Sequence, residues 1–196
     1  MSKQSENLLP ADGIVHLYQD FLSSSAASCL MERIDQQTDW TQREIIIFGK
    51  PVMQPRLMAW YGDREYQYSG IRLSPIEWHP TLLNVKSIIE EQSGVKFNTA
   101  LLNLYRNGED SMGWHQDNEK SLGHEPVIAS LSLGAERKFK LKHIDDKNQI
   151  VNVQLKHGSL LIMAGLSQHK WKHCLPKTRQ SVGTRINITF RNVLSG

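Results

Sequence analysis

The sequence TRINITFR, at residues 184–191 of this 196-residue chain, alternates strictly between polar and apolar side chains. A period of two is typical of a β-strand that buries one face. The polar face carries Arg185 and Arg191 but no acid, which favours anion binding over the alternative of a solvent-facing strand with free arginines. Six residues of strand span about 20 Å, so the two arginines cannot hold one carboxylate together and should have different partners.

The sequence WHQD at residues 114–117, together with His173, supplies the residue types of a metal site. Two imidazoles and one carboxylate form the facial triad that binds non-haem Fe(II) and leaves coordination positions open. His115 and Asp117 are two residues apart, so in an extended chain both side chains would point at the same ion. His169 is the alternative to His173 as the third ligand.

Iron beside an arginine-rich strand favours a dicarboxylate co-substrate such as 2-oxoglutarate, with its keto-acid end on the metal and its far carboxylate on an arginine. Asn103 and Tyr105 share one face of another alternating run, residues 101–105. Both would be good uncharged donors to that carboxylate. The alternative is a plain strand with a half-buried tyrosine.

The chain resembles the AlkB family of DNA and RNA dealkylating dioxygenases across residues 40–193. The resemblance rests on five motifs in the family's order and spacing: Asn103-x-Tyr105, Trp114-His115-x-Asp117-x-Glu119, His157-Gly158-Ser159-Leu160-Leu161-x-Met163, His173-x-Leu175-Pro176 and Arg185-x-Asn187-x-Thr189-Phe190-Arg191. It implies Fe(II), 2-oxoglutarate and oxidative demethylation of alkylated bases. It also implies a mainly β fold with flanking helices and a double-stranded β-helix (jelly-roll) core.

The same resemblance implies roles for single residues. The iron ligands would be His115, Asp117 and His173. The 2-oxoglutarate contacts would be Asn103, Tyr105, Arg185, Asn187 and Arg191. Many repair members of the family carry an acid where this chain has Asn118, which leaves the choice between methyladenine and methylcytosine open.

Residues 40–72 resemble the base-recognition lid of the family's DNA-repair members. Aromatic residues interleaved with arginine suit a flipped base, which is held by stacking and edge hydrogen bonds. We expect substrate contacts from Phe48, Arg56, Tyr66, Tyr68, Ser69, Trp114 and Glu119. Phe48 would wedge into a duplex to fill the gap left by the flipped base. The alternative is that Phe48 and the two tyrosines belong to the core.

The chain length predicts one domain at residues 13–196, preceded by a loose leader at residues 1–12. Amphipathic patterns predict helices at 23–37 and 80–92, packed on the outside of a sheet. Strands are predicted at 44–48 and near 99–105, 127–133, 137–143, 150–155, 158–163 and 184–191. Successive strands joined by short turns favour a sandwich or a barrel.

The composition, with 39% hydrophobic and 22% charged residues, is that of a globular protein without a membrane span or a signal peptide. We therefore expect an intracellular monomer, cytoplasmic in a bacterium and nuclear in a eukaryote. It would act on alkylated DNA, single- or double-stranded, with RNA as a further possibility. Two other functions stay open: a 2-oxoglutarate-dependent hydroxylase of a protein or small molecule, and a non-catalytic nucleic-acid binder, against which the intact ligand set argues.

Overall fold

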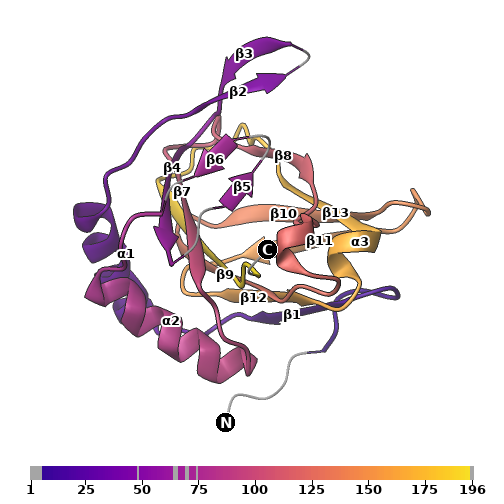
Figure 1. Ribbon diagram of the computed structural model, residues 1–196, viewed down its shortest axis with the longest axis horizontal. Helices are drawn as coiled ribbons and strands as arrows, with labels where there is room; N and C mark the ends of the chain where they lie inside the picture. The colour runs from indigo at the N-terminus through magenta and orange to yellow at the C-terminus, as the bar shows by residue number, and fades with distance from the viewer. Residues whose placement is uncertain (1–5, 48, 64–65, 69–70, 74, 195–196) are drawn as a thin grey trace.

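Two antiparallel sheets form a sandwich in this computed structural model, which describes residues 6–47, 49–63, 66–68, 71–73 and 75–194 (Figure 1). The larger sheet has the strand order β1 (Ile14–Tyr18), β12 (Leu160–Ala164), β9 (Ile128–Gly134), β14 (Arg185–Arg191), β7 (Thr99–Tyr105) and β4 (Leu57–Gly62). The smaller sheet has the order β11 (Ile150–Leu155), β10 (Arg137–His143), β13 (Trp171–Leu175) and β8 (Met112–His115). This arrangement is the predicted jelly-roll core.

Two short hairpins and three helices complete the described elements. The hairpins pair β2 (Glu44–Ile47) with β3 (Lys50–Met53), and β5 (Tyr66–Tyr68) with β6 (Ile71–Leu73). The helices are α1 (Ser24–Gln37), α2 (Pro80–Ser93) and the one-turn α3 (Ser167–Lys170), with a 3₁₀ turn at Lys120–Leu122. None of the helices in the described part combines the length and the apolar composition that a bilayer crossing requires.

The ends of α1 and α2 follow from local side-chain chemistry. The Ser23 hydroxyl accepts a hydrogen bond from the Ala26 N–H and so caps the start of α1. Pro80 opens α2, where its missing N–H costs nothing. Gly94 ends α2 in the left-handed conformation, with φ of 70°, which glycine adopts without a steric penalty. Both predicted helices are confirmed to within one residue at either end.

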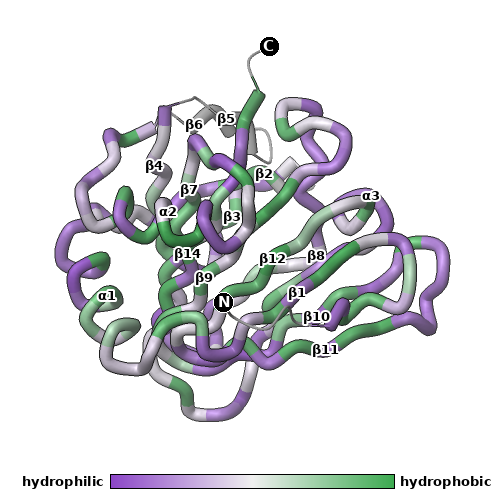
Figure 2. The backbone as a smooth tube through the Cα atoms, turned by 90° about the horizontal axis from the view of Figure 1, so that it is seen from below, coloured by the Kyte–Doolittle hydropathy of each residue, from purple (hydrophilic) through white to green (hydrophobic). Residues whose placement is uncertain are grey.

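Strand β14 lies inside the larger sheet between β9 and β7, and all seven of its residues are buried. Its apolar residues Ile186, Ile188 and Phe190 join the core between this sheet and the two long helices. Its polar residues face the second core, which lies between the two sheets. The alternation in the sequence therefore separates a structural face from a pocket face, and the sandwich layers are visible in Figure 2.

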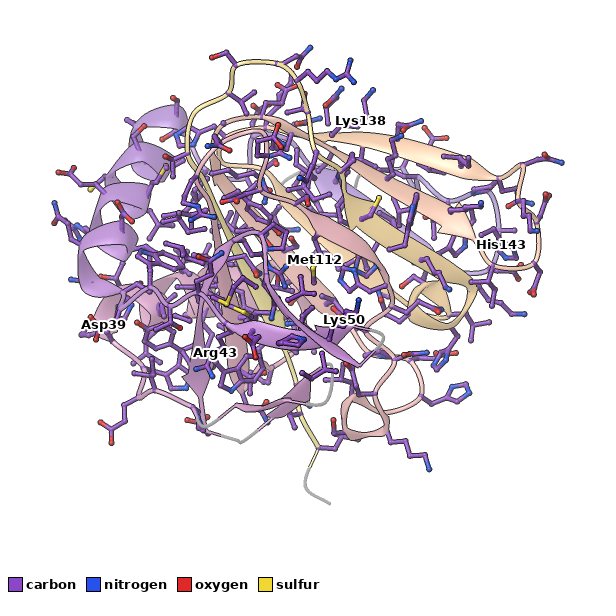
Figure 3. All side chains as sticks on the ribbon, turned by 90° about the horizontal axis from the view of Figure 1, so that it is seen from above. Asp39, Arg43, Lys50, Met112, Lys138 and His143 are labelled. Atoms are coloured by element: carbon purple, nitrogen blue, oxygen red, sulfur yellow. The ribbon has the colours of Figure 1, made fainter. Side chains whose placement is uncertain are left out.

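The predicted lid at 40–72 comprises several strands, and its role in base recognition stays a prediction. Its middle part is β4, which pairs with β7 and buries four consecutive residues, Met58, Ala59, Trp60 and Tyr61. The β2–β3 hairpin projects from the sandwich (Figure 1), and the view from above places it, with Lys50 labelled, in front of the strands (Figure 3). Within this range β4 is thus part of the sheet, and the β2–β3 hairpin is a described part that projects from it.

The predicted loose leader is wrong for residues 7–12. Leu9 is 4% exposed, and the side-chain oxygen of Asn7 accepts hydrogen bonds from the backbone N–H groups of Leu9 and Val15. The indole of Trp171 donates to the Ala11 carbonyl. A single apolar residue and one well-placed amide are enough to attach this segment to the sandwich, and neither forms a periodic pattern.

Candidate metal and co-substrate site

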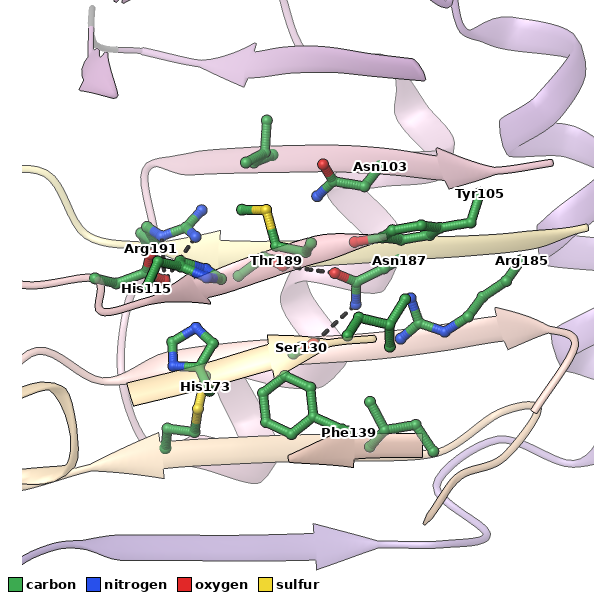
Figure 4. Close-up of a pocket in the computed structure, with 16 residues that line it drawn as sticks. Asn103, Tyr105, His115, Ser130, Phe139, His173, Arg185, Asn187, Thr189 and Arg191 are labelled. Atoms are coloured by element: carbon green, nitrogen blue, oxygen red, sulfur yellow. Dashed lines mark hydrogen bonds and ion pairs between the residues drawn. The ribbon is translucent and has the colours of Figure 1, made fainter. Parts of the chain in front are cut away.

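Three predicted ligands meet at one end of the space between the sheets. His115 on β8 and His173 on β13 are register partners, and their ring centroids are 4.2 Å apart. Asp117 follows two residues after the end of β8. The ligand atoms of the three side chains all lie within 4.8 Å of one another (Figure 4), which is close enough to hold one ion.

Asp117 is clamped by Arg191 at the end of β14. The guanidinium donates to Asp117 Oδ2 from Nη2 at 2.6 Å and from Nε at 3.1 Å, and both side chains are buried. Burial alone would raise the pKa of Asp117, but the charge and hydrogen bonds of Arg191 together with His115 and His173 outweigh it, and the pKa falls to about 2. The second oxygen, Oδ1, has no hydrogen-bond partner among the described residues and is available to a metal ion.

The two histidines are held in the neutral form that metal ions bind. Burial lowers the pKa of His173 to about 3, and repulsion from His115 and Arg191 adds to the effect. Burial also lowers the pKa of His115. Nδ1 of His115 donates to the Gly113 carbonyl at 2.8 Å, which leaves the lone pair on Nε2 free for coordination.

His169, the alternative third ligand, lies outside this group. It is on α3, its imidazole contacts the carbonyl of His124, and the two imidazole rings are tilted by 33° with centroids 5.3 Å apart. The geometry therefore favours His173, as the sequence motif did.

Arg185 lies at the opposite end of the same pocket face of β14. It is 2% exposed, and burial lowers the pKa of its guanidinium to about 10, so the group stays charged at neutral pH. Nη2 donates to Ser132 Oγ at 2.9 Å, and the guanidinium carbon lies 5.3 Å from the centroid of the Tyr105 ring. Its Nε has no hydrogen-bond partner, and no carboxylate forms an ion pair with it, among the described residues. A buried cation in this state calls for an anionic ligand.

The amides of the pocket wall are largely engaged with the protein. Asn187 donates to Ser130 Oγ and to the Leu131 carbonyl, and it accepts from the Thr189 hydroxyl. Asn103 accepts a 2.7 Å hydrogen bond from Arg56 Nε, so its amide N–H groups remain for a ligand. The sequence interpretation missed Ser130 and Ser132, although both alternate with apolar residues along β9 and so carried a readable signal. It quoted Thr189 in a motif but gave it no role.

The predicted substrate residues differ in their exposure, and some of them lie outside the described part of the chain. Arg56 is 3% exposed, and its side chain donates to the buried Asn103. Trp114, next to His115 in the chain, is 47% exposed. Glu119 immediately precedes the 3₁₀ turn after Asp117. Tyr66 and Tyr68 lie on β5, but their side chains fall outside the described part. Phe48 and Ser69 lie outside the described residues altogether.

The jelly roll, the His–Asp–His group and the buried arginine define a protein class, the Fe(II)- and 2-oxoglutarate-dependent oxygenases. Residues 14–191 match the family model described as the 2OG-Fe(II) oxygenase superfamily. A donor set of two neutral imidazoles and one carboxylate fits Fe(II). The anion-free guanidinium of Arg185 fits the far carboxylate of 2-oxoglutarate.

Similarity to known proteins identifies the branch of this superfamily to which the chain belongs. The chain is 44% identical over 188 residues to human alpha-ketoglutarate-dependent dioxygenase alkB homolog 3, covering 91% of this chain and 66% of that protein. It is 34% identical over 198 residues to mouse DNA oxidative demethylase ALKBH2, covering 95% and 83%. It superposes on the solved structure of OsALKBH1 with a TM-score of 0.65 and 18% identity, covering 91% and 97%, which shows a shared fold. The chain belongs to the AlkB family of 2OG-Fe(II) oxygenases and spans just under two thirds of the length of its alkB homolog 3 relatives.

Proposed function

We propose that this chain removes N-alkyl groups oxidatively from nucleic-acid bases, using Fe(II), O2 and 2-oxoglutarate. The main support for this proposal is that the His–Asp–His group and the anion-free guanidinium of Arg185 line one pocket. Two relatives, one named as an alpha-ketoglutarate-dependent dioxygenase and one as a DNA oxidative demethylase, support this proposal.

We assign His115, Asp117 and His173 to the metal, and Asn103, Tyr105, Arg185, Asn187 and Arg191 to 2-oxoglutarate. Bound Fe(II) and 2-oxoglutarate supply the oxidation of the N-alkyl carbon. The chain's own groups do the rest: Arg185 fixes the far carboxylate, and Asn103 offers amide donors from the wall of the pocket. Asn187 keeps the wall in place through Ser130 and Thr189. Arg191 acts at the metal end by keeping Asp117 ionised and oriented.

The overall reaction balances without a protein acid or base. An N-methyl base, O2 and 2-oxoglutarate give the free N–H base, formaldehyde, succinate and CO2. This agrees with the described pocket, where His115, Asp117 and His173 are the titratable side chains near the metal position and all three serve as ligands.

The proposal includes a nucleic-acid partner, and here we infer DNA, bound by a monomer inside the cell. Trp114 is exposed beside the metal position and is a platform for stacking an extruded base. We assign substrate contacts also to Glu119 and to the predicted lid residues Phe48, Arg56, Tyr66, Tyr68 and Ser69.

The deciding experiment measures formaldehyde and succinate from a panel of N-methylated oligonucleotides, each offered single-stranded and in a duplex. We expect both products in equal amounts, dependent on Fe(II) and 2-oxoglutarate. Succinate formation without formaldehyde from any oligonucleotide, but with turnover of a peptide or small-molecule substrate, would replace the proposal by a hydroxylase of another substrate class.

A further inference from the structure

Gln168 on α3 is a buried polar residue that the sequence analysis did not select. It has no exposed surface, and its side-chain Oε1 accepts a 3.0 Å hydrogen bond from the backbone N–H of Asp117. Its backbone carbonyl accepts a second 3.0 Å bond from the side-chain amide of Gln116. Two hydrogen bonds thus join α3 to the His-x-Asp segment, and neither of them can be inferred from a motif.

The backbone of Asp117 needs this partner because it lies outside the sheet. Strand β8 ends at His115, which is also the last residue of its ladder with β13. The N–H of Asp117 therefore has no strand partner, although the residue is 1% exposed. A buried N–H without an acceptor is costly, and Gln168 supplies the acceptor that the ladder lacks.

We propose that Gln168 is a positioning residue, which holds the backbone of Asp117 so that its carboxylate faces the same ion as His115 and His173. The inference rests on the proposed function, because it treats the His–Asp–His group as the metal site. Gln168 acts through Asp117 and does not itself touch the ion.

Two elements would then fix one carboxylate. Arg191 on β14 holds Oδ2, Gln168 on α3 holds the backbone, and the remaining oxygen Oδ1 is left for the metal. Helix α3 also runs directly into β13, which carries His173 five residues after Gln168. A shift of α3 would therefore move two ligands together, and the hydrogen bond from Asp117 keeps them in register.

The test uses the full chain with Co(II) as an oxygen-insensitive probe for the metal. Gln168→Met keeps the length of the side chain and its packing beside Met163 but removes the acceptor oxygen, whereas Gln168→Glu keeps an acceptor. We expect Gln168→Met to weaken Co(II) binding about 10- to 100-fold and to change the visible Co(II) spectrum. Gln168→Glu should bind Co(II) close to the wild-type affinity.

Ser159→Ala is the matched control for a general loss of stability. Ser159 is fully buried and donates to the Lys156 carbonyl, in a turn that lines no part of the pocket. The Ser159→Ala variant should have a lower melting temperature than the wild type and the same Co(II) affinity. Wild-type affinity and spectrum in Gln168→Met, or equal losses in Gln168→Met and Gln168→Glu, would overturn the inference.

A measurement on the unaltered chain covers the case in which Gln168→Met does not fold. In the metal-free protein the Asp117 amide should exchange with solvent at least ~100-fold more slowly than an unprotected amide, because its N–H is bonded to a buried acceptor. Rapid exchange of that amide would also overturn the inference. Failure of the wild-type chain to bind Co(II) at all would instead refute the proposed function, so the two failures are distinguishable.

Discussion

The charged residues of the pocket divide into those that the protein already satisfies and those that await a ligand. Arg191 and Oδ2 of Asp117 form an ion pair within hydrogen-bond distance, while Oδ1 of Asp117 has no partner among the described residues. The described contacts of Arg185 are the Ser132 hydroxyl and the Tyr105 side chain, through its ring face and a hydrogen bond, although the guanidinium is equally buried. The two arginines are six residues apart on one strand and have different partners, as expected from a spacing too long for both to hold one carboxylate.

The choice between the two candidate histidines can be tested at this scale. His173→Ala should abolish Co(II) binding and formaldehyde release, because it removes one of three ligand atoms that lie within 4.8 Å of each other. His169→Ala should keep both, since its ring contacts His124 on the surface. Isothermal titration with Co(II) separates the two; metal binding that survives His173→Ala but not His169→Ala would reverse the assignment.

The sequence selected the three candidate ligands, which the fold brings together, because metal-binding chemistry is restricted to few residue types. Histidine, aspartate and arginine in that order are recognisable without a fold. Gln168 and Ser132 were missed because their roles depend on position alone: a glutamine on any helix could point to solvent. Only the packing of α3 against the His-x-Asp segment gives Gln168 its partner.

At the scale of elements, burial on both faces did not by itself hide a strand, because polar side chains can line one of the buried faces, as they do in β14. Strand β14 alternates and was predicted from its period. Strand β4 is buried on both faces, so it reads as a continuous apolar run, and its aromatic residues suggested a lid instead. Strands β8 and β13 were not predicted either, because they are short and their exposed and buried residues do not alternate regularly.

The junction of α2 and β7 is predicted to be sensitive to acid. The Glu90 carboxylate accepts from Lys86, Lys96 and the Phe97 N–H, and although burial would raise its pKa, these bonds lower it to about 2. Because the folded pKa is below the unfolded one, near 4.5, this stabilisation is complete above pH 4.5 and is lost as the pH falls towards 2.

Glu90→Gln should therefore lower the free energy of unfolding by about 1–3 kcal/mol at pH 7, and by much less at pH 2.5. Urea denaturation at both pH values measures the difference. The exposed neighbour Glu91 provides the control, since Glu91→Gln should change little at either pH. An equal loss in Glu90→Gln at both pH values would mean that packing, and not charge, explains its contribution.

The β2–β3 hairpin carries a separate prediction for the nucleic acid. Its side chains Ile46, Val52 and Met53 are 68%, 41% and 48% exposed, so burial in the core does not account for the apolar character of the hairpin. If Phe48 wedges into a duplex, Phe48→Ala should depress repair of methylated duplex far more than repair of the same base in a single strand, which has no stack to open.

Rates on both substrates, with the melting temperature as a control, decide this point. The conservative variant Phe48→Leu should keep most of the duplex activity, because it retains an apolar wedge. Equal losses on both substrates, accompanied by a fall in melting temperature of several degrees, would make the hairpin part of the scaffold and remove the support for a duplex substrate.

At the scale of the whole molecule, the sandwich is a frame that holds charged groups between two sheets. The class of fold could be predicted because strand followed strand with short turns and the motifs kept a family order. Which strands become neighbours could not, since β14 pairs with residues of β7 that are 80–92 positions away in the chain and with residues of β9 that are 51–61 positions away. Those pairings place Arg185 beside both Tyr105 and Ser132.

A buried cation without an anion makes the stability of the whole domain depend on its ligands. Co(II) and 2-oxoglutarate bind the folded state alone. At a concentration of about 100 times its dissociation constant, each ligand should therefore raise the free energy of unfolding by about 2.7 kcal/mol and the melting temperature by ~5–10 °C.

Arg185→Met should keep the increment from Co(II) and lose the increment from 2-oxoglutarate, because the far carboxylate loses its partner. Arg179→Met, which removes an equal charge from an exposed position, should keep both increments. A full 2-oxoglutarate increment in Arg185→Met would show that the co-substrate lies elsewhere. The buried guanidinium would then need another anion to explain why this domain retains it.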